Sequence, residues 1–138
     1  MKDADHAEYN PKAANPLLVL VSCAVANRPD GAPRLYGKLK IAISPDSLAY
    51  KIYQKSEIQE PFNCNYELNP SFRGQLESHG LKVSGVSADG STRIIELPDH
   101  CFFIATGFLP QLSSEANKPH PLIVAYLKAA LEPKGTSI

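Results

Sequence analysis

The residues of this chain that could do chemistry are its three cysteines and four histidines. A cysteine acts as a nucleophile in its thiolate form, which a neighbouring cation or base must stabilise. Cys64 lies in a polar segment, whereas Cys23 and Cys101 lie in apolar segments that predict core packing. Cys64 is therefore the candidate nucleophile or redox thiol. Its neighbours Asn63 and Asn65 carry no charge, which favours an unreactive thiol.

The cysteines and histidines are scattered along the chain, without a C-x-x-C pair or the spacing typical of a zinc site. We therefore expect no metal ion and no cofactor. His120 lies between Pro119 and Pro121, where we expect a helix cap or a surface residue. An odd number of cysteines and a polar, acidic N-terminus unlike a signal peptide predict reduced thiols and a cytoplasmic location.

The composition argues against two classes of partner. Lys and Arg total 14 and Asp and Glu total 14, so the formal net charge is zero, and nothing favours a nucleic acid or an anionic membrane surface. No apolar run approaches the ~20 residues that a membrane span needs. A chain of 138 residues with 43% hydrophobic residues predicts one globular domain with a packed core.

Apolar runs and turn signals predict an α/β layered domain. Residues 1–16 should form a polar N-terminal arm, 17–131 the domain, and 132–138 a frayed tail. The expected strands and short extended pieces are 17–25, 36–44, 57–60, 62–68, 81–87, 92–97 and the buried strand 101–108. The expected helices are 45–53, 69–79 with Asn69 as the cap, and 119–131. The last helix should turn five side chains to the core: Leu122, Ile123, Tyr126, Leu127 and Ala130.

Several segments occur in an order that resembles a known family. They are 66–69 (YELN), 80–90 (a hairpin beginning Gly-Leu and ending Asp-Gly), 94–98 (IIELP), 103–106 (FIAT) and 119–122 (PHPL). Together they resemble the C-terminal part of the class I glutamine amidotransferase domain of CTP synthase. The resemblance implies a partial, flavodoxin-like layered domain, with a mixed sheet, helices packed on it and a β-hairpin.

The sequence departs from that family at the positions that carry its chemistry. Leu109 and Gln111 stand where the family has its catalytic histidine and glutamate, and Asn65 stands where an arginine helps to hold glutamine. Leucine cannot transfer a proton, and glutamine has no charge to stabilise an imidazolium. The family's nucleophile turn would lie before Met1, and no Gly-x-Cys-x-Gly pattern occurs in the sequence.

These departures lead to three hypotheses. The first is a non-catalytic, CTP-synthase-like amidotransferase fragment with a binding, regulatory or assembly role in CTP biosynthesis and glutamine metabolism. Its partner would be a second copy or a separately encoded amidotransferase-like chain, and Asn63, Asn65 and Tyr66 could bind a small amide or amino acid. The second is a Cys64-dependent hydrolase or transferase that acts on a small amide. The third is a degenerate product of a truncated gene.

Overall fold

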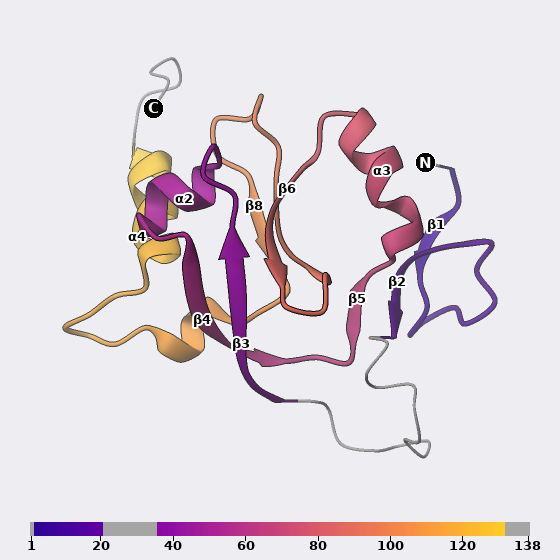
Figure 1. The fold of residues 1–138 in the computed structure, drawn as a ribbon, viewed down its shortest axis with the longest axis horizontal. Coiled ribbons are helices and arrows are strands. Elements are labelled where there is room, and N and C mark those ends of the chain that lie inside the picture. Colours follow the sequence, from indigo (N-terminus) through magenta and orange to yellow (C-terminus); the bar gives the residue numbers. More distant parts are fainter. Residues whose placement is uncertain (1, 21–35, 132–138) are drawn as a thin grey trace.

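The computed structural model describes residues 2–20 and 36–131, which form two sheets, three α-helices and one 3-10 helix. One sheet is mixed and has the order β1-β2-β5, and the other is antiparallel and has the order β4-β3-β6-β7-β8 (Figure 1). The strands are β1 (Ala4–His6), β2 (Asn15–Leu20), β3 (Tyr36–Ile43), β4 (Glu57–Asn63), β5 (Tyr66–Leu68), β6 (Lys82–Ser87), β7 (Thr92–Glu96) and β8 (Ile104–Thr106). The helices are α2 (Leu48–Tyr53), α3 (Pro70–Ser78), η1 (Pro110–Ser113) and α4 (Pro121–Leu131). The predicted α/β class, with its mixed sheet and hairpin, is confirmed.

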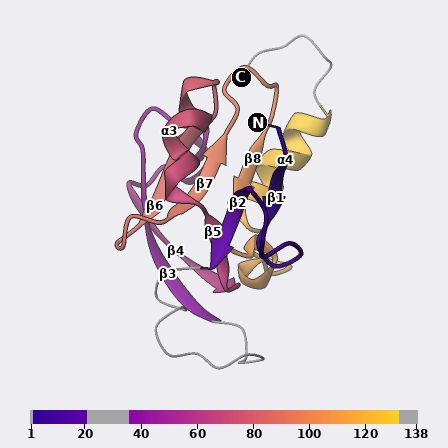
Figure 2. The ribbon, with the colours of Figure 1, turned by 90° about the vertical axis from the view of Figure 1, so that its right-hand side faces the viewer.

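The helices cover both faces of the five-stranded sheet. Helices α2 and α4 contact each other on one face, and α3 lies against the other (Figures 1 and 2). Alternation along β3 directs Ile41 and Ile43 into the core and leaves Ala42 exposed. The buried apolar side chains are Ile41, Ile43, Ala49, Ile58, Ile94, Phe108 and Leu122. The core therefore lies between the sheet and the pair α2 and α4.

Helix α2 has only six residues and depends on contacts beyond its own sequence. The Ser47 hydroxyl accepts a hydrogen bond from the Tyr50 N–H at 3.0 Å, as an N-cap should. The carboxylate of Glu96, from β7, accepts the N–H groups of Leu48 at 2.9 Å and Ala49 at 2.7 Å. Glu96 is only 3% exposed, so it fixes the start of α2 to the sheet.

We expect Glu96→Ala to lower the free energy of unfolding by about 2–3 kcal/mol, because two backbone N–H groups lose a charged acceptor. Glu96→Gln keeps one acceptor oxygen, so its free energy of unfolding should fall by less. Urea denaturation followed by circular dichroism measures both values. Glu77→Ala, on the exposed side of α3, is the control, and equal losses in Glu77→Ala and Glu96→Ala would contradict this role of Glu96.

Two local predictions are confirmed. The Asn69 side chain accepts the Ser71 N–H at 3.0 Å and Pro70 occupies the first turn, so α3 begins where expected. The hairpin of β6 and β7 turns through Gly90 at φ +83°. In that turn the Ser87 hydroxyl donates to Asp89, and this hydrogen bond is the main reason that the pKa of the Asp89 carboxyl is lowered.

The predicted buried strand 101–108 is largely wrong. Only Ile104–Thr106 form a strand, and this β8 pairs with β7 at the edge of the sheet. Cys101 is exposed, so the prediction that it packs in the core is wrong, and of residues 101–108 only Phe108 is fully buried. An edge strand has neighbours on one side alone, which explains why an apolar run here is not enclosed. Cys23 lies outside the described residues.

Both ends of the described chain also differ from expectation. Within the predicted polar arm, Ala4–His6 form β1, parallel to β2. On α4, Leu122 is buried as predicted, but Tyr126 and Leu127 are 59% and 55% exposed, so the prediction that they face the core is wrong. The prediction for Ala130 is also wrong, since it is exposed. The predicted tail, 132–138, is outside the described residues, and no described helix is long and apolar enough to cross a membrane.

Candidate functional site

The segment after β8 carries Leu109 and Gln111. The Leu109 N–H donates to the Pro61 carbonyl at 2.9 Å, which ties the start of η1 to the end of β4. Leu109 is half-buried and Gln111 is exposed. An aliphatic side chain and a neutral amide at these places provide neither a general base nor an anion.

The predicted ligand residues lie where β4 passes into β5. Asn63 ends β4 and is exposed, while Cys64, Asn65 and Tyr66 are half-buried. The Tyr66 N–H donates to the Cys64 sulfur at 3.4 Å, a contact that orients the thiol without bringing a charge to it. Leu109 is hydrogen-bonded to Pro61, which is two residues before Asn63, so the start of η1 lies beside the end of β4.

Tyr66 belongs to the three-stranded sheet. Its ring centroid lies 4.7 Å from that of His6 on β1, and its backbone pairs with Leu20 on β2. Burial raises the pKa of the Tyr66 hydroxyl, and the negative charge of Glu8 raises it further. The Tyr66 hydroxyl is therefore protonated at neutral pH. The Tyr66 ring contacts His6 on β1.

Beside η1 lies a cluster of Tyr53, Glu60, Ser113 and His120, which we call the buried polar cluster after the buried Glu60 and His120; Tyr53 is half-buried and Ser113 is exposed. Glu60 Oε1 is 2.9 Å from the Tyr53 hydroxyl and 2.8 Å from His120 Nε2, and Glu60 Oε2 is 3.0 Å from the Ser113 hydroxyl. Glu60 and His120 are 4% and 3% exposed. The four side chains come from α2, β4, η1 and the residue before α4, so the cluster joins four separate elements.

The hydrogen bonds fix where the protons lie. The Leu122 N–H donates to His120 Nδ1 at 3.2 Å, so Nδ1 is an acceptor and Nε2 carries the proton given to Glu60. Burial and the nearby Glu60 charge raise the pKa of Tyr53, which remains a donor. Both ring nitrogens of His120 are hydrogen-bonded, so the imidazole caps α4 and is not available as a base.

The hydrogen bond from Leu122 agrees with the predicted capping role of His120, but the alternative of a surface residue is wrong, because His120 is 3% exposed. Tyr53, Glu60 and Ser113 were not predicted as its partners. A signal was present, because Ile58 and Glu60 fall on the same face of β4, and Ile58 is a core residue. A carboxylate on a buried face requires hydrogen-bond donors. The donors themselves come from residues distant in sequence, and no local pattern identifies them.

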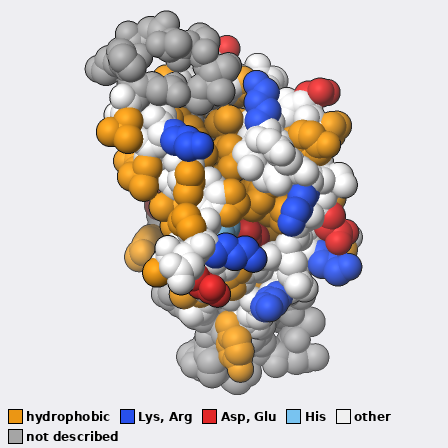
Figure 3. All heavy atoms as spheres, turned by 90° about the vertical axis from the view of Figure 1, so that its left-hand side faces the viewer, with side chains coloured by type: hydrophobic (Ala, Val, Ile, Leu, Met, Phe, Trp, Pro, Cys, Tyr) orange, Lys and Arg blue, Asp and Glu red, His pale blue; other side chains and the backbone are white. Residues whose placement is uncertain are grey.

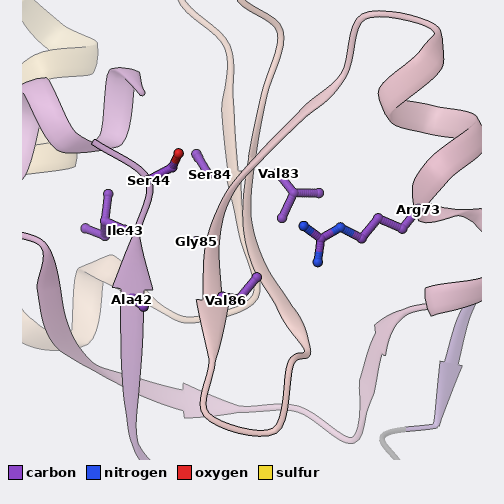
Figure 4. Close-up of a pocket in the computed structure, with 8 residues that line it drawn as sticks. All are labelled: Ala42, Ile43, Ser44, Arg73, Val83, Ser84, Gly85 and Val86. Carbon is purple, nitrogen blue, oxygen red and sulfur yellow. The ribbon is translucent and has the colours of Figure 1, made fainter. Parts of the chain in front are cut away.

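A separate hollow of about 290 Å³ opens between β3, β6 and α3. Figure 4 shows the Arg73 side chain reaching from α3 toward Val83, with Ser44 and Ser84 on the other side. Ser84 is the extra residue of a β-bulge, since Val83 pairs with Ile95 and Gly85 with Ile94. The hollow is lined mainly by small apolar side chains, and Arg73 already pairs with Glu77 at 3.5 Å. Its lining offers no acid–base pair.

Comparisons with known proteins show what the chain is similar to. No family model matches the chain. It is 38% identical over 131 residues to CTP synthase from Picosynechococcus sp. (strain ATCC 27264 / PCC 7002 / PR-6), a match that covers 94% of this chain and 24% of that protein. It is 37% identical over 139 residues to CTP synthase from Rippkaea orientalis, a match that covers 100% of this chain and 25% of that protein. The chain thus spans about a quarter of the length of these relatives.

Among solved structures, the glutaminase domain of Trypanosoma brucei CTPS, with bound acivicin, superimposes with a TM-score of 0.86 at 24% identity. The match covers 99% of this chain and 53% of that one. The chain matches part of the glutamine amidotransferase domain of CTP synthases. The predicted resemblance to that domain and the predicted fold are therefore confirmed. The buried polar cluster lies beside the segment that holds Leu109 and Gln111.

Proposed function

We propose that this CTP-synthase-like domain does not hydrolyse glutamine and has an assembly or regulatory role in the cytoplasm, related to CTP biosynthesis and glutamine metabolism. One feature of the sequence supports the proposal. The resemblance to the family implies that Leu109 and Gln111, after β8, stand where the family has its catalytic histidine and glutamate.

The chemistry of amide hydrolysis supports this assignment. A thiol nucleophile needs a base that takes its proton and later protonates the departing ammonia, and a carboxylate that orients that base. Leu109 can do neither task, and a neutral amide at Gln111 stabilises no imidazolium. His120 does not replace the missing base, because its Nδ1 accepts from Leu122 and its Nε2 donates to Glu60.

The assembly role has its own support in apolar side chains left exposed on α4. Leu131 is 85% exposed and Tyr126 is 59% exposed. Exposed large apolar side chains that lie together mark surfaces for protein partners. The partner would be a second copy of the chain or a separately encoded amidotransferase-like chain.

Titration with L-glutamine in a calorimeter tests the loss of substrate binding. We expect no saturable heat at millimolar glutamine, because Asn65 replaces a charged arginine and cannot pair with the substrate carboxylate. Asn65→Ala is the control and should give the same flat trace. Saturable binding that Asn65→Ala abolishes would instead make Asn63, Asn65 and Tyr66 a working amino-acid site.

A further inference from the structure

The turn that joins β6 and β7 carries an Asp-Gly pair, Asp89 and Gly90. This turn lies away from α2 and α4 (Figures 1 and 2). Figure 3 shows the side of the molecule on which those two helices lie, where hydrophobic side chains are spread between isolated basic ones. Chemistry at the turn therefore depends neither on the proposed assembly role nor on the proposed loss of catalysis.

An Asp-Gly pair can rearrange its own backbone without an enzyme. The Gly90 nitrogen would form a bond to the carboxyl carbon of the Asp89 side chain, the N–H hydrogen and the carboxyl OH would leave as water, and a five-membered succinimide ring would result. Water then opens the ring, and opening at the main-chain carbonyl gives isoaspartate. Glycine favours this reaction because it has no side chain that obstructs the approach of its nitrogen. The reaction needs a carboxyl group that has its proton and a backbone nitrogen that can reach it.

The Asp89 carboxyl group is held in the form that reacts least. Asp89 Oδ1 accepts hydrogen bonds from the Ser87 hydroxyl at 2.6 Å and from the Ser91 N–H at 3.1 Å. Hydrogen bonds to a carboxylate stabilise its ionised form, and they lower the pKa of Asp89. An ionised carboxylate has no OH group that can leave as water.

The Gly90 nitrogen is held by the same serine. The Gly90 N–H donates to the Ser87 carbonyl at 2.8 Å. Arg93, which is 5% exposed, donates from Nε to Ser87 Oγ at 3.1 Å, so the hydroxyl hydrogen is left for Asp89. The other acceptor of that hydrogen, the Ser91 carbonyl, is farther away at 3.3 Å. Ser87 therefore restrains both groups that would have to react.

We propose that Asp89 and Gly90 form a site of isoaspartate formation that the folded hairpin protects, with Ser87 as the protecting residue. In the folded chain the reaction must wait until the turn opens and the two hydrogen bonds of Ser87 break. In the unfolded chain neither group is restrained, so the pair reacts as any flexible Asp-Gly segment does. Isoaspartate at position 89 thus records how often this hairpin opens.

Isoaspartate formation in the purified chain, kept folded in buffer or unfolded in urea, tests the protection. Trypsin releases residues 83–93 as one peptide, in which Asp89 is the only aspartate, and the other Asp-Gly pair, Asp30 and Gly31, falls in a different peptide. Fragmentation in a mass spectrometer distinguishes isoaspartate from aspartate in each peptide. After several weeks at neutral pH, we expect peptide 83–93 to contain at least about tenfold more isoaspartate in the unfolded sample than in the folded one.

Two variants test the role of Ser87. Ser87→Ala removes the hydroxyl that holds Asp89, so the folded variant should form isoaspartate about ten times faster than the folded wild type. Asp89→Glu is the matched control, because its longer side chain cannot form the five-membered ring, and its peptide 83–93 should stay unchanged. Circular dichroism checks that both variants are folded.

Two results would overturn the proposal. If wild-type peptide 83–93 reacted as fast in the folded chain as in urea, the hairpin would not protect the site. If folded Ser87→Ala reacted at the wild-type rate, Ser87 would not be the protecting residue. The first comparison needs no variant, so it holds even where Ser87→Ala does not fold.

Discussion

Replacing Glu60 with alanine is expected to lower the free energy of unfolding by about 3–5 kcal/mol, the largest effect that we predict for one side chain. The substitution removes the acceptor of three donors, which are the buried His120 Nε2, the half-buried Tyr53 hydroxyl and the hydroxyl of the exposed Ser113. The His120 Nε2–H and the Tyr53 hydroxyl would then lose their charged acceptor, at a cost of about 1–3 kcal/mol for a buried polar group. A domain of this size has about 5–15 kcal/mol in total, so Glu60→Ala should be close to unfolding at 37 °C.

The matched control for this variant is Glu57→Ala on the same strand. The Glu57 side chain is 62% exposed, and its ion pair with Lys40, at 3.5 Å, is exposed as well. Replacing Glu57 with alanine should change the free energy of unfolding by no more than about 0.5 kcal/mol. Chemical denaturation measures both variants. If Glu60→Ala lost less than about 1 kcal/mol, the buried polar cluster would not be the link between η1, α2, β4 and α4 that we infer.

The second large effect is expected for Gly85→Ala, with a loss of about 2–3 kcal/mol. A Cβ atom at position 85 would lie 2.6, 2.8 and 2.9 Å from the Cγ1, Cδ1 and Cβ atoms of Ile94. These distances are shorter than any normal carbon–carbon contact. Ile94 is 0% exposed and fixed in the core, so the added methyl group must push β6 away from β7.

Gly74→Ala provides the opposite control. Gly74 lies inside α3, and an added Cβ there meets no atom within 4 Å. Alanine should raise stability by about 0.5–1 kcal/mol, because it restricts the unfolded chain and favours the helix. Thermal denaturation of the two variants should thus give shifts of opposite sign. Equal destabilisation by both alanines would show that the close packing of Gly85 on Ile94 is not the cause.

Features fixed by local chemistry could be predicted from the sequence. Asn69 followed by Pro70 sets the start of α3, and the turn with Gly90 sets the hairpin, because each depends on neighbouring residues alone. The family resemblance further predicted the class of fold, because the matching motifs occur in order along the chain. The assignment of Leu109 and Gln111 to the family's catalytic positions stays a prediction.

Features fixed by distant residues could not be predicted. The burial of segment 101–108 depends on how many strands flank it, and β8 turned out to lie at an edge. The prediction of which side of α4 is buried was also wrong. Its residues are apolar on nearly all sides, so their spacing does not show which side faces the core. The buried polar cluster joins Glu60 to Ser113 and His120, more than fifty residues away, and no spacing along the chain links them.

The most direct test of the central claim is ammonia release from L-glutamine by the purified chain, followed in a coupled enzymatic assay. We predict a rate equal to that of the buffer alone at every glutamine concentration, because Leu109 and Gln111 cannot move a proton. Cys64→Ser should give the same result. Ammonia release that saturates with glutamine and disappears in Cys64→Ser would contradict the account and make Cys64 the nucleophile of a rebuilt active site.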